Sequence, residues 1–292
     1  MDAHLIQHTT DLNLLLHEAL PDDLDILVDY VTDRGKGRLA LDGTICKVLV
    51  RAKQTQSYGP NERAALANEI LEFGGNTLGN AFRRVRSSLP FISDSGGAAA
   101  SGTVPYDEIV GDVASHLGVK VSKGSPIAIV EEGILRKMMG DAVQKMTDAQ
   151  RHEVEVALGL GTSAVSQAAL IVLLQTGRMG GFATYKMAAM VANASARALL
   201  GRGLPLAVNS ALSRTVGVAL GPIGWALMAA WTLADLSSPA YRVTVPCVVH
   251  IAYLRTRMLA EAKYIECPAC HDMIERTARF CSSCGAAQGG NA

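Results

Sequence analysis

An acid-free, apolar block runs from Val156 to Ala234 and limits the folds that are open to this chain. The block contains five basic residues and no Asp or Glu, and it includes the uncharged runs 156–177 and 215–234. Helices of soluble proteins normally have one polar and one apolar face, whereas these runs are apolar nearly all round. Such helices belong either in the middle of a large helical bundle or in lipid.

Glycine and proline interrupt both runs, at Gly159, Gly161, Gly217 and the Gly221-Pro222 break. Further glycines divide the block into about four helices. Each is marginal in length for a membrane span, which needs about 20 apolar residues. The interruptions favour buried helices of a soluble bundle over inserted ones.

The remaining periodicity is helical and predicts an all-α fold. Apolar residues recur every three to four positions in segments such as 22–33, 105–117 and 126–145. Thr147 and Gln150 form a capping box that starts a helix at 147–157. A helix is expected from its cap at Asn61 to Phe73, where Gly74 would end it.

Four segments follow from this pattern. Residues 1–90 are acidic amphipathic helices, 91–104 a small-residue linker, 105–262 a helical core containing the apolar basic block 156–236, and 263–292 a zinc ribbon and tail. The predicted architecture is therefore a multi-helix bundle with a very apolar, Gly/Ala-rich central block and a small C-terminal zinc ribbon with four cysteine ligands.

The chain is neutral overall, but its charges are unevenly distributed. Residues 1–155 carry 22 acidic and 16 basic residues, whereas 156–258 carry one acidic and eight basic residues. This asymmetry favours contact between the two parts or attraction to anionic lipid. Nucleic acid is not an expected partner, because the basic residues are sparse and are not interleaved with aromatic ones.

The most specific chemical signal is a pair of CxxC motifs, Cys267-Pro-Ala-Cys270 and Cys281-Ser-Ser-Cys284. Two such motifs supply four thiolates, the ligand set of a closed tetrahedral zinc site. A redox dithiol is the alternative for either motif alone. Because a four-thiolate site leaves no open coordination position, the zinc is predicted to be structural. His271 could replace one cysteine as a ligand, but a supporting or solvent-facing role is expected for it.

The basic residues of the apolar block have two interpretations. They extend to the bundle surface and keep it hydrated, or they bind lipid phosphates beside an apolar face. Lys186 and Arg197 share one helix face, and Met187 and Val191 lie on the other, where they would meet the acyl boundary. The candidate lipid-binding residues are Arg178, Lys186, Arg197, Arg202 and Arg214.

No enzyme signature accompanies these features. The sequence has no phosphate-binding P-loop, no dinucleotide-binding glycine motif, no HExxH and no GxSxG. The chain is therefore expected to be non-enzymatic, with no catalytic residues and zinc as its cofactor.

Several stretches resemble the YaaW-like family of bacterial proteins. They include NERAALANEILEFGGNTLGNAFR at 61–83, RMGGFATYKMAAMVANASARALLGRGLPLAVNSAL at 178–212, GPIGWALMAAWTLADL at 221–236 and AYRVTVPCVVHIAYLR at 240–255. The resemblance covers residues 11–258 and does not include the ribbon. The linker at 92–103 also departs from the pattern of the family. It implies an all-helical protein with no established enzymatic activity. It also implies anti-phage defence, as a cytoplasmic sensor of a lipid vesicle formed early in infection that acts with a pore-forming-toxin-like protein.

The expected function is thus a non-enzymatic sensor or adaptor in the cytoplasm, peripheral to a membrane or to a lipid vesicle. Its ribbon would contact a protein partner, and homo-oligomers are compatible with the sequence. One alternative is an integral, inner-membrane or pore-forming effector that uses the 156–236 helices. The other is a soluble, chaperone-like helical protein.

Overall fold

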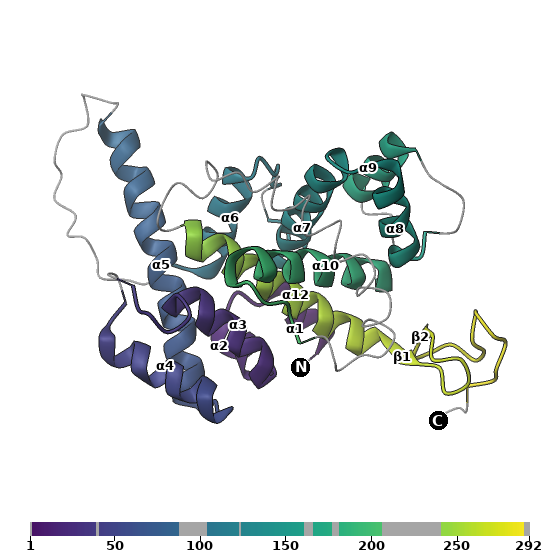
Figure 1. The fold of residues 1–292 in the computed structure, drawn as a ribbon, viewed down its shortest axis with the longest axis horizontal. Helices are drawn as coiled ribbons and strands as arrows, with labels where there is room; N and C mark the ends of the chain where they lie inside the picture. The colour runs from purple at the N-terminus through teal and green to yellow at the C-terminus, as the bar shows by residue number, and fades with distance from the viewer. Residues whose placement is uncertain are drawn as a thin grey trace.

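Helix α12 (Tyr241–Lys263) lies at the centre of the fold and carries the ribbon at its end (Figure 1). The computed structural model describes residues 2–38, 41–87, 104–122, 124–160, 166–176, 181–205 and 241–288, with the backbone alone at 76–87, 175 and 176. Within these ranges the regular secondary structure is helical except for one two-stranded sheet and one isolated β-bridge, so the prediction of an all-α fold is confirmed.

Eleven helices are defined in the described ranges. Besides α12 they are α1 (Ala3–His8), α2 (Leu12–His17), α3 (Pro21–Thr32), α4 (Gly43–Thr55), α5 (Pro60–Ser87), α6 (Tyr106–His116), α7 (Ile127–Gln144), α8 (Asp148–Leu158), α9 (Gln167–Thr176) and α10 (Gly181–Leu200). The two strands are β1 (Tyr264–Glu266) and β2 (Met273–Glu275), which follow α12 directly.

Helices α10 and α12 form the interior of the bundle. Every residue from 187 to 196 is buried, as is nearly all of α12 from Val243 to Leu254. The two helices pack on each other, with Tyr185 stacked on Tyr253 at 6.1 Å between ring centroids. Around them lie α1, α3, α5, α6 and α7. An apolar helix surrounded on all sides needs no polar face, which explains the composition of this part of the block.

The buried face of α10 corrects one expectation. Met187 and Val191 were expected to be available to an acyl boundary, but both are fully buried in the protein core. Helix α9, in the same block, lies against α7 with Leu170 and Leu174 buried and Val172 exposed. The uncharged run 215–234 lies outside the described residues.

Two arginines of α12 form ion pairs inside the bundle. Arg255 donates from Nε to Glu131 of α7 at 2.6 Å, and its guanidinium also donates to the carbonyl of Ile6 in α1. The Tyr106 hydroxyl of α6 donates to the same carboxylate at 2.8 Å. Arg257 pairs with Asp23 of α3 at 2.6 Å. These bonds connect α12 to helices from the first half of the chain.

Helix α5 also departs from expectation. It begins at Pro60, so Asn61 lies in its first turn rather than at its cap, and it continues past Phe73 to Ser87. Gly74 does not end the helix. Instead, a Cβ at this position would overlap the side chain of Ile109, so the glycine allows α6 to approach α5 closely. The capping box of Thr147 and Gln150 at the start of α8 is confirmed.

Candidate metal centre

The candidate metal centre is built on the short sheet that continues from α12. Strands β1 and β2 pair antiparallel, with Tyr264 opposite Glu275 and Glu266 opposite Met273. The first CxxC motif begins at Cys267, directly after β1, and the second begins at Cys281, six residues after β2. The sheet therefore fixes the position of the first CxxC motif, and the chain turns back after β2 to bring the second motif beside the first.

The four cysteine Sγ atoms converge on one point. All lie within 4.8 Å of one another, with 3.8 Å between the Cys267 and Cys284 sulfurs and 3.6 Å between those of Cys270 and Cys281. A tetrahedral zinc with Zn–S bonds of about 2.3 Å requires S–S separations of about 3.8 Å. The donor set and its spacing therefore fit a four-coordinate thiophilic ion, and zinc is the ion that we propose for it.

The two CxxC loops have the same backbone hydrogen bonds. In the first, the Cys267 amide donates to Asp272 at 2.8 Å, and the His271 amide donates to Cys267 at 2.9 Å. In the second, the Cys281 amide donates to Ala286 at 2.8 Å, and the Gly285 amide donates to Cys281 at 2.9 Å.

His271 and Gly285 occupy equivalent places in these loops, each with a positive φ, of 62° and 75° respectively. Glycine adopts this backbone conformation without strain, whereas histidine does so rarely. The His271 ring lies 2.7 Å from Glu266, outside the cluster of sulfurs. Of the residues that the structure describes, only the four cysteines make up the candidate ligand set.

Backbone amides favour the thiolate form of two of these cysteines. The amides of Cys270 and Ala269 donate toward Cys267 and lower the pKa of its thiol to about 6. The amides of Cys284 and Ser283 lower the pKa of the Cys281 thiol in the same way. The Asp272 amide lowers the pKa of the Cys270 thiol, but contacts with the neighbouring cysteine sulfurs and desolvation outweigh this effect and raise that pKa to about 12. Because a metal binds the thiolate rather than the thiol, Cys267 and Cys281 are the two ligands that the backbone prepares for a cation.

The ribbon is fastened to the helix from which it emerges. Arg276 donates from Nε and Nη2 to the carbonyl of Glu261, at 3.1 and 2.9 Å. Lys263 pairs with Glu275 at 3.0 Å across the first residues of the sheet. A metal ion bound by all four thiolates would stabilise the ribbon, but it would have no coordination position open for a substrate. The arrangement is therefore suited to a structural metal.

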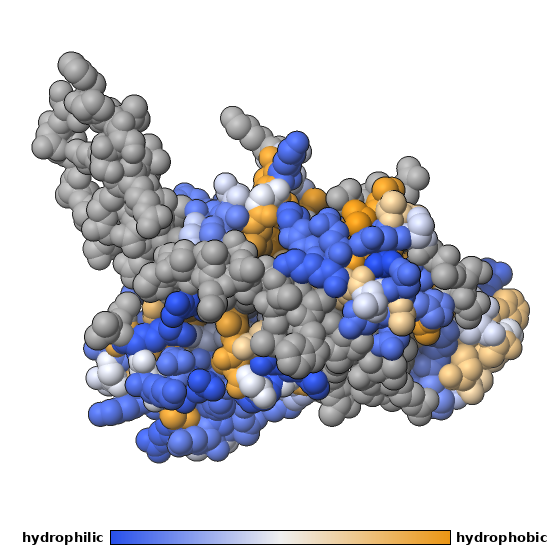
Figure 2. All heavy atoms as spheres, turned by 45° about the horizontal axis from the view of Figure 1, so that its top comes forward, coloured by the Kyte–Doolittle hydropathy of each residue, from blue (hydrophilic) through white to orange (hydrophobic). Residues whose placement is uncertain are grey.

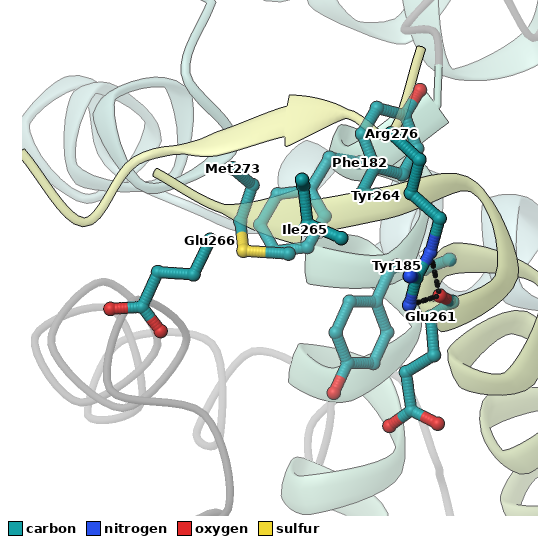
Figure 3. Close-up of a pocket in the computed structure, with 9 residues that line it drawn as sticks. Phe182, Tyr185, Glu261, Tyr264, Ile265, Glu266, Met273 and Arg276 are labelled. Atoms are coloured by element: carbon teal, nitrogen blue, oxygen red, sulfur yellow. Dashed lines mark hydrogen bonds between the residues drawn. The ribbon is translucent and has the colours of Figure 1, made fainter. Parts of the chain in front are cut away.

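A pocket lies where the ribbon meets the helical body (Figure 3). It has a volume of about 310 Å³. Its walls come from α10, α12 and both strands, and are formed by Phe182, Tyr185, Ala260, Glu261, Tyr264, Ile265, Glu266, Met273 and Arg276. The cysteine spacing gave no sign of this pocket, because its residues are distributed over nearly a hundred positions of the chain.

Of the candidate lipid-binding residues, the structure describes Lys186, Arg197 and Arg202, whose surroundings differ. Arg178 and Arg214 lie outside the described ranges. Lys186 is half-buried, with its ammonium 5.6 Å from the centroid of Phe182, and burial lowers its pKa. Arg202 forms an ion pair with the buried Asp29 at 2.6 Å, and Arg197 is exposed. Among the three candidates that the structure describes, Arg197 is therefore the one most available to an external anion.

The visible surface carries hydrophilic residues over much of its described area, with hydrophobic ones in separate patches (Figure 2). Exposed apolar side chains include Val156 on α8 and Val172 on α9. Across the parts of the chain that the structure describes, no helix combines the length and hydropathy needed to cross a bilayer.

Comparisons with known proteins identify relatives in Helicobacter pylori. One UPF0174 protein of strain J99 is 34% identical over 194 residues, which cover 66% of this chain and 70% of the relative. A second UPF0174 protein of that strain is 33% identical over 204 residues, covering 67% of this chain and 88% of the relative. A UPF0174 protein of strain 26695 is 33% identical over 202 residues, with the same two shares. No family model and no solved structure matches the chain.

Proposed function

This chain belongs to the UPF0174 family, and we propose that it is a non-enzymatic adaptor that joins a lipid surface to a protein partner. A zinc-stabilised ribbon would present the partner-binding surface, and the helical body would associate with lipid. The observation that carries the proposal is the closed cluster of four thiols on a ribbon fastened to the central helix. A closed site supports a structural role for the metal rather than a catalytic one.

The position of the ribbon supports a contact role. It extends beyond the helical body at one end of the molecule, as Figure 1 shows, and Phe280 on it is 64% exposed. A large aromatic side chain on a small metal-stabilised module is typical of a residue that anchors a protein interface. Metal loss would disorder this surface, so partner binding would depend on zinc.

The lipid part of the proposal rests on charge rather than on an apolar face. Met187 and Val191 are buried, and Arg197 is the charged side chain of α10 that is exposed. A basic residue close to an anionic membrane contributes about 1 kcal/mol, and salt weakens the attraction. The association would therefore be peripheral and reversible.

The resemblance to the YaaW-like family adds a biological setting to this proposal. In that setting the chain would be a cytoplasmic sensor in anti-phage defence, one that detects a lipid vesicle and signals to a separate effector. The acid-free block and the absence of recognisable catalytic motifs from the sequence are compatible with such a role.

Flotation of the full-length, zinc-loaded protein with anionic and neutral vesicles tests the lipid part. We expect flotation with anionic vesicles at low salt and release at high salt. Failure to float with either vesicle would refute lipid association. Protein that stays in the membrane fraction of cells after a carbonate wash would instead support the integral-membrane alternative.

A further inference from the structure

We propose that the loop after α3 and the exposed face of α4 form the surface through which this protein docks on an anionic lipid bilayer. The inference rests on the proposed lipid association and assigns that association to one surface. Four basic side chains make up this surface, which we call the basic patch: Arg34, Lys36, Lys47 and Arg51. None of them lies in the acid-free block, where the lipid contact was expected from the sequence.

The charge of the chain changes sign abruptly after α3. Residues 1–33 carry eight acidic residues and no lysine or arginine, whereas residues 34–57 carry six basic residues and one acidic residue. The one acid, Asp42, is the N-cap of α4 and accepts hydrogen bonds from the Thr44 and Ile45 amides. The stretch from the loop through α4 is therefore basic within a half of the chain that is acidic on average.

The acidic residues of α3 do not neutralise these bases, because they face the interior. Asp23, Asp25 and Asp29 are buried, and each accepts a hydrogen bond or an ion pair inside the bundle. Two of the six bases are also directed inward: Lys53 pairs with Asp29, and Arg38 donates to two carbonyls of α3. The four bases of the patch are exposed, and they form no ion pair with any residue that the structure describes.

Packing of the loop on α4 brings the four bases of the patch close together. A Cβ at Gly35 would lie 3.4 Å from the side chain of Val50, so the loop crosses α4 at this point. The two bases of the loop flank this glycine in the sequence. Lys47 and Arg51 lie one helical turn apart beside Val50, on the exposed face of the helix. Loop and helix therefore contribute to one continuous basic surface.

The composition of the basic patch favours a lipid surface over other polyanions. A basic amphipathic helix is typical of helices that lie on anionic membranes, and Val48 on α4 adds an apolar side chain that is 40% exposed. Single-stranded nucleic acid is less well matched, because residues 34–57 contain no aromatic ring on which a base could stack. The half-buried Asp33, which adjoins the patch in the sequence, leaves it with a net positive charge.

The position of the patch is compatible with simultaneous binding of a protein partner. Figure 1 places α4 at the lower left of the molecule and the ribbon at the right, toward the opposite end. The described surface at the lower left is mostly hydrophilic in Figure 2. Lipid bound at α4 would therefore leave the ribbon accessible.

Flotation of the full-length, zinc-loaded protein with vesicles of phosphatidylserine and phosphatidylcholine in equal parts tests the basic patch. Lys47→Gln/Arg51→Gln removes two charges and keeps side chains that favour a helix. A basic residue near an anionic surface changes the affinity about fivefold, so this variant should bind roughly twentyfold to thirtyfold more weakly at low salt. Arg34→Gln/Lys36→Gln should have a similar effect. Added salt should weaken binding of either variant less steeply than binding of the wild-type protein.

Lys120→Gln/Arg279→Gln is the matched control. It removes the same amount of charge from two exposed bases that lie outside the patch, one before α7 and one on the ribbon. This variant should float as the wild-type protein does. Far-UV circular dichroism and zinc content, measured on every variant, ensure that lost flotation is not lost folding. If the loop variant does not fold, the α4 variant decides the outcome alone.

Three results would overturn the proposal. Equal flotation of the α4 variant and the control would exclude the patch but leave the lipid association of the wild-type protein in place. Failure of the wild-type protein to float would refute the lipid association and, with it, this docking surface. Tighter binding of a mixed-sequence DNA duplex than of the vesicles, lost in the same variants, would assign the patch to nucleic acid instead.

Discussion

Arg255→Met is the substitution that most severely tests how the central helix is held. In the wild-type protein, Arg255 and Glu131 are both about 2% exposed and their side chains meet at 2.6 Å. The substitution keeps the apolar stem of Arg255 but leaves the Glu131 carboxylate buried without its cation. Removing one partner of a buried ion pair costs about 3–5 kcal/mol of unfolding free energy. This is a large share of the roughly 5–15 kcal/mol that stabilises a typical domain.

The loss should depend on pH in a defined direction. Desolvation raises the pKa of Glu131 above its usual value of 4.5, against the lowering effect of Arg255. Without Arg255 the pKa rises further, so the folded protein binds a proton more readily than the unfolded chain. Stability of the variant then falls as pH rises from the unfolded pKa toward the folded one. The cost of Arg255→Met should therefore be smaller near pH 5 than near pH 7.

Urea unfolding followed by far-UV circular dichroism measures the cost, at both pH values, from the transition midpoint and slope. Adding Glu131→Gln to the variant should recover about 1–2 kcal/mol, because the buried charge is removed as well. Lys137→Met, which breaks a half-exposed pair with Asp141 on the same helix, is the control and should cost about 0.5 kcal/mol or less. The reasoning would be refuted if Arg255→Met cost no more than Lys137→Met.

Three further predictions concern the ribbon, the exposed base and a helix crossing. Cys281→Ser should release the metal and lose the ribbon structure while the helical circular dichroism persists; intact metal binding would contradict the ligand assignment. Arg197→Glu should weaken flotation with anionic vesicles roughly threefold to tenfold at low salt, and unchanged flotation of the folded variant would exclude this residue from the lipid contact. Gly74→Ala should cost about 1–3 kcal/mol in urea unfolding because of overlap with Ile109, whereas Gly43→Ala, with open space around it, should be nearly neutral; equal costs would refute the steric explanation.

Local sequence patterns predicted the features that are formed by residues close together in the sequence. The spacing of the CxxC motifs identified Cys267 and Cys281 as members of one cluster, because two short loops joined by a short spacer can meet without help from the rest of the fold. The Thr147 capping box was likewise predictable, since both of its hydrogen bonds lie within four residues. Such features need no knowledge of distant neighbours.

Features that depend on distant neighbours were missed. Periodicity showed that Met187 belongs to an apolar face but not that protein, rather than lipid, covers it. Gly74 resembled a helix terminator because the sequence does not reveal that α6 crosses at that point. The partner of Arg255 lies 124 residues away, and no local pattern indicates that pairing.

We propose that the four thiolates of the ribbon hold one structural zinc ion. X-ray absorption at the zinc edge, combined with metal analysis of freshly purified and reduced full-length protein, tests it most directly. About one zinc per chain is expected, surrounded by four sulfur atoms at about 2.3 Å and by no nitrogen or oxygen ligand. Protein without zinc, or zinc with nitrogen or oxygen in its coordination shell, would contradict it.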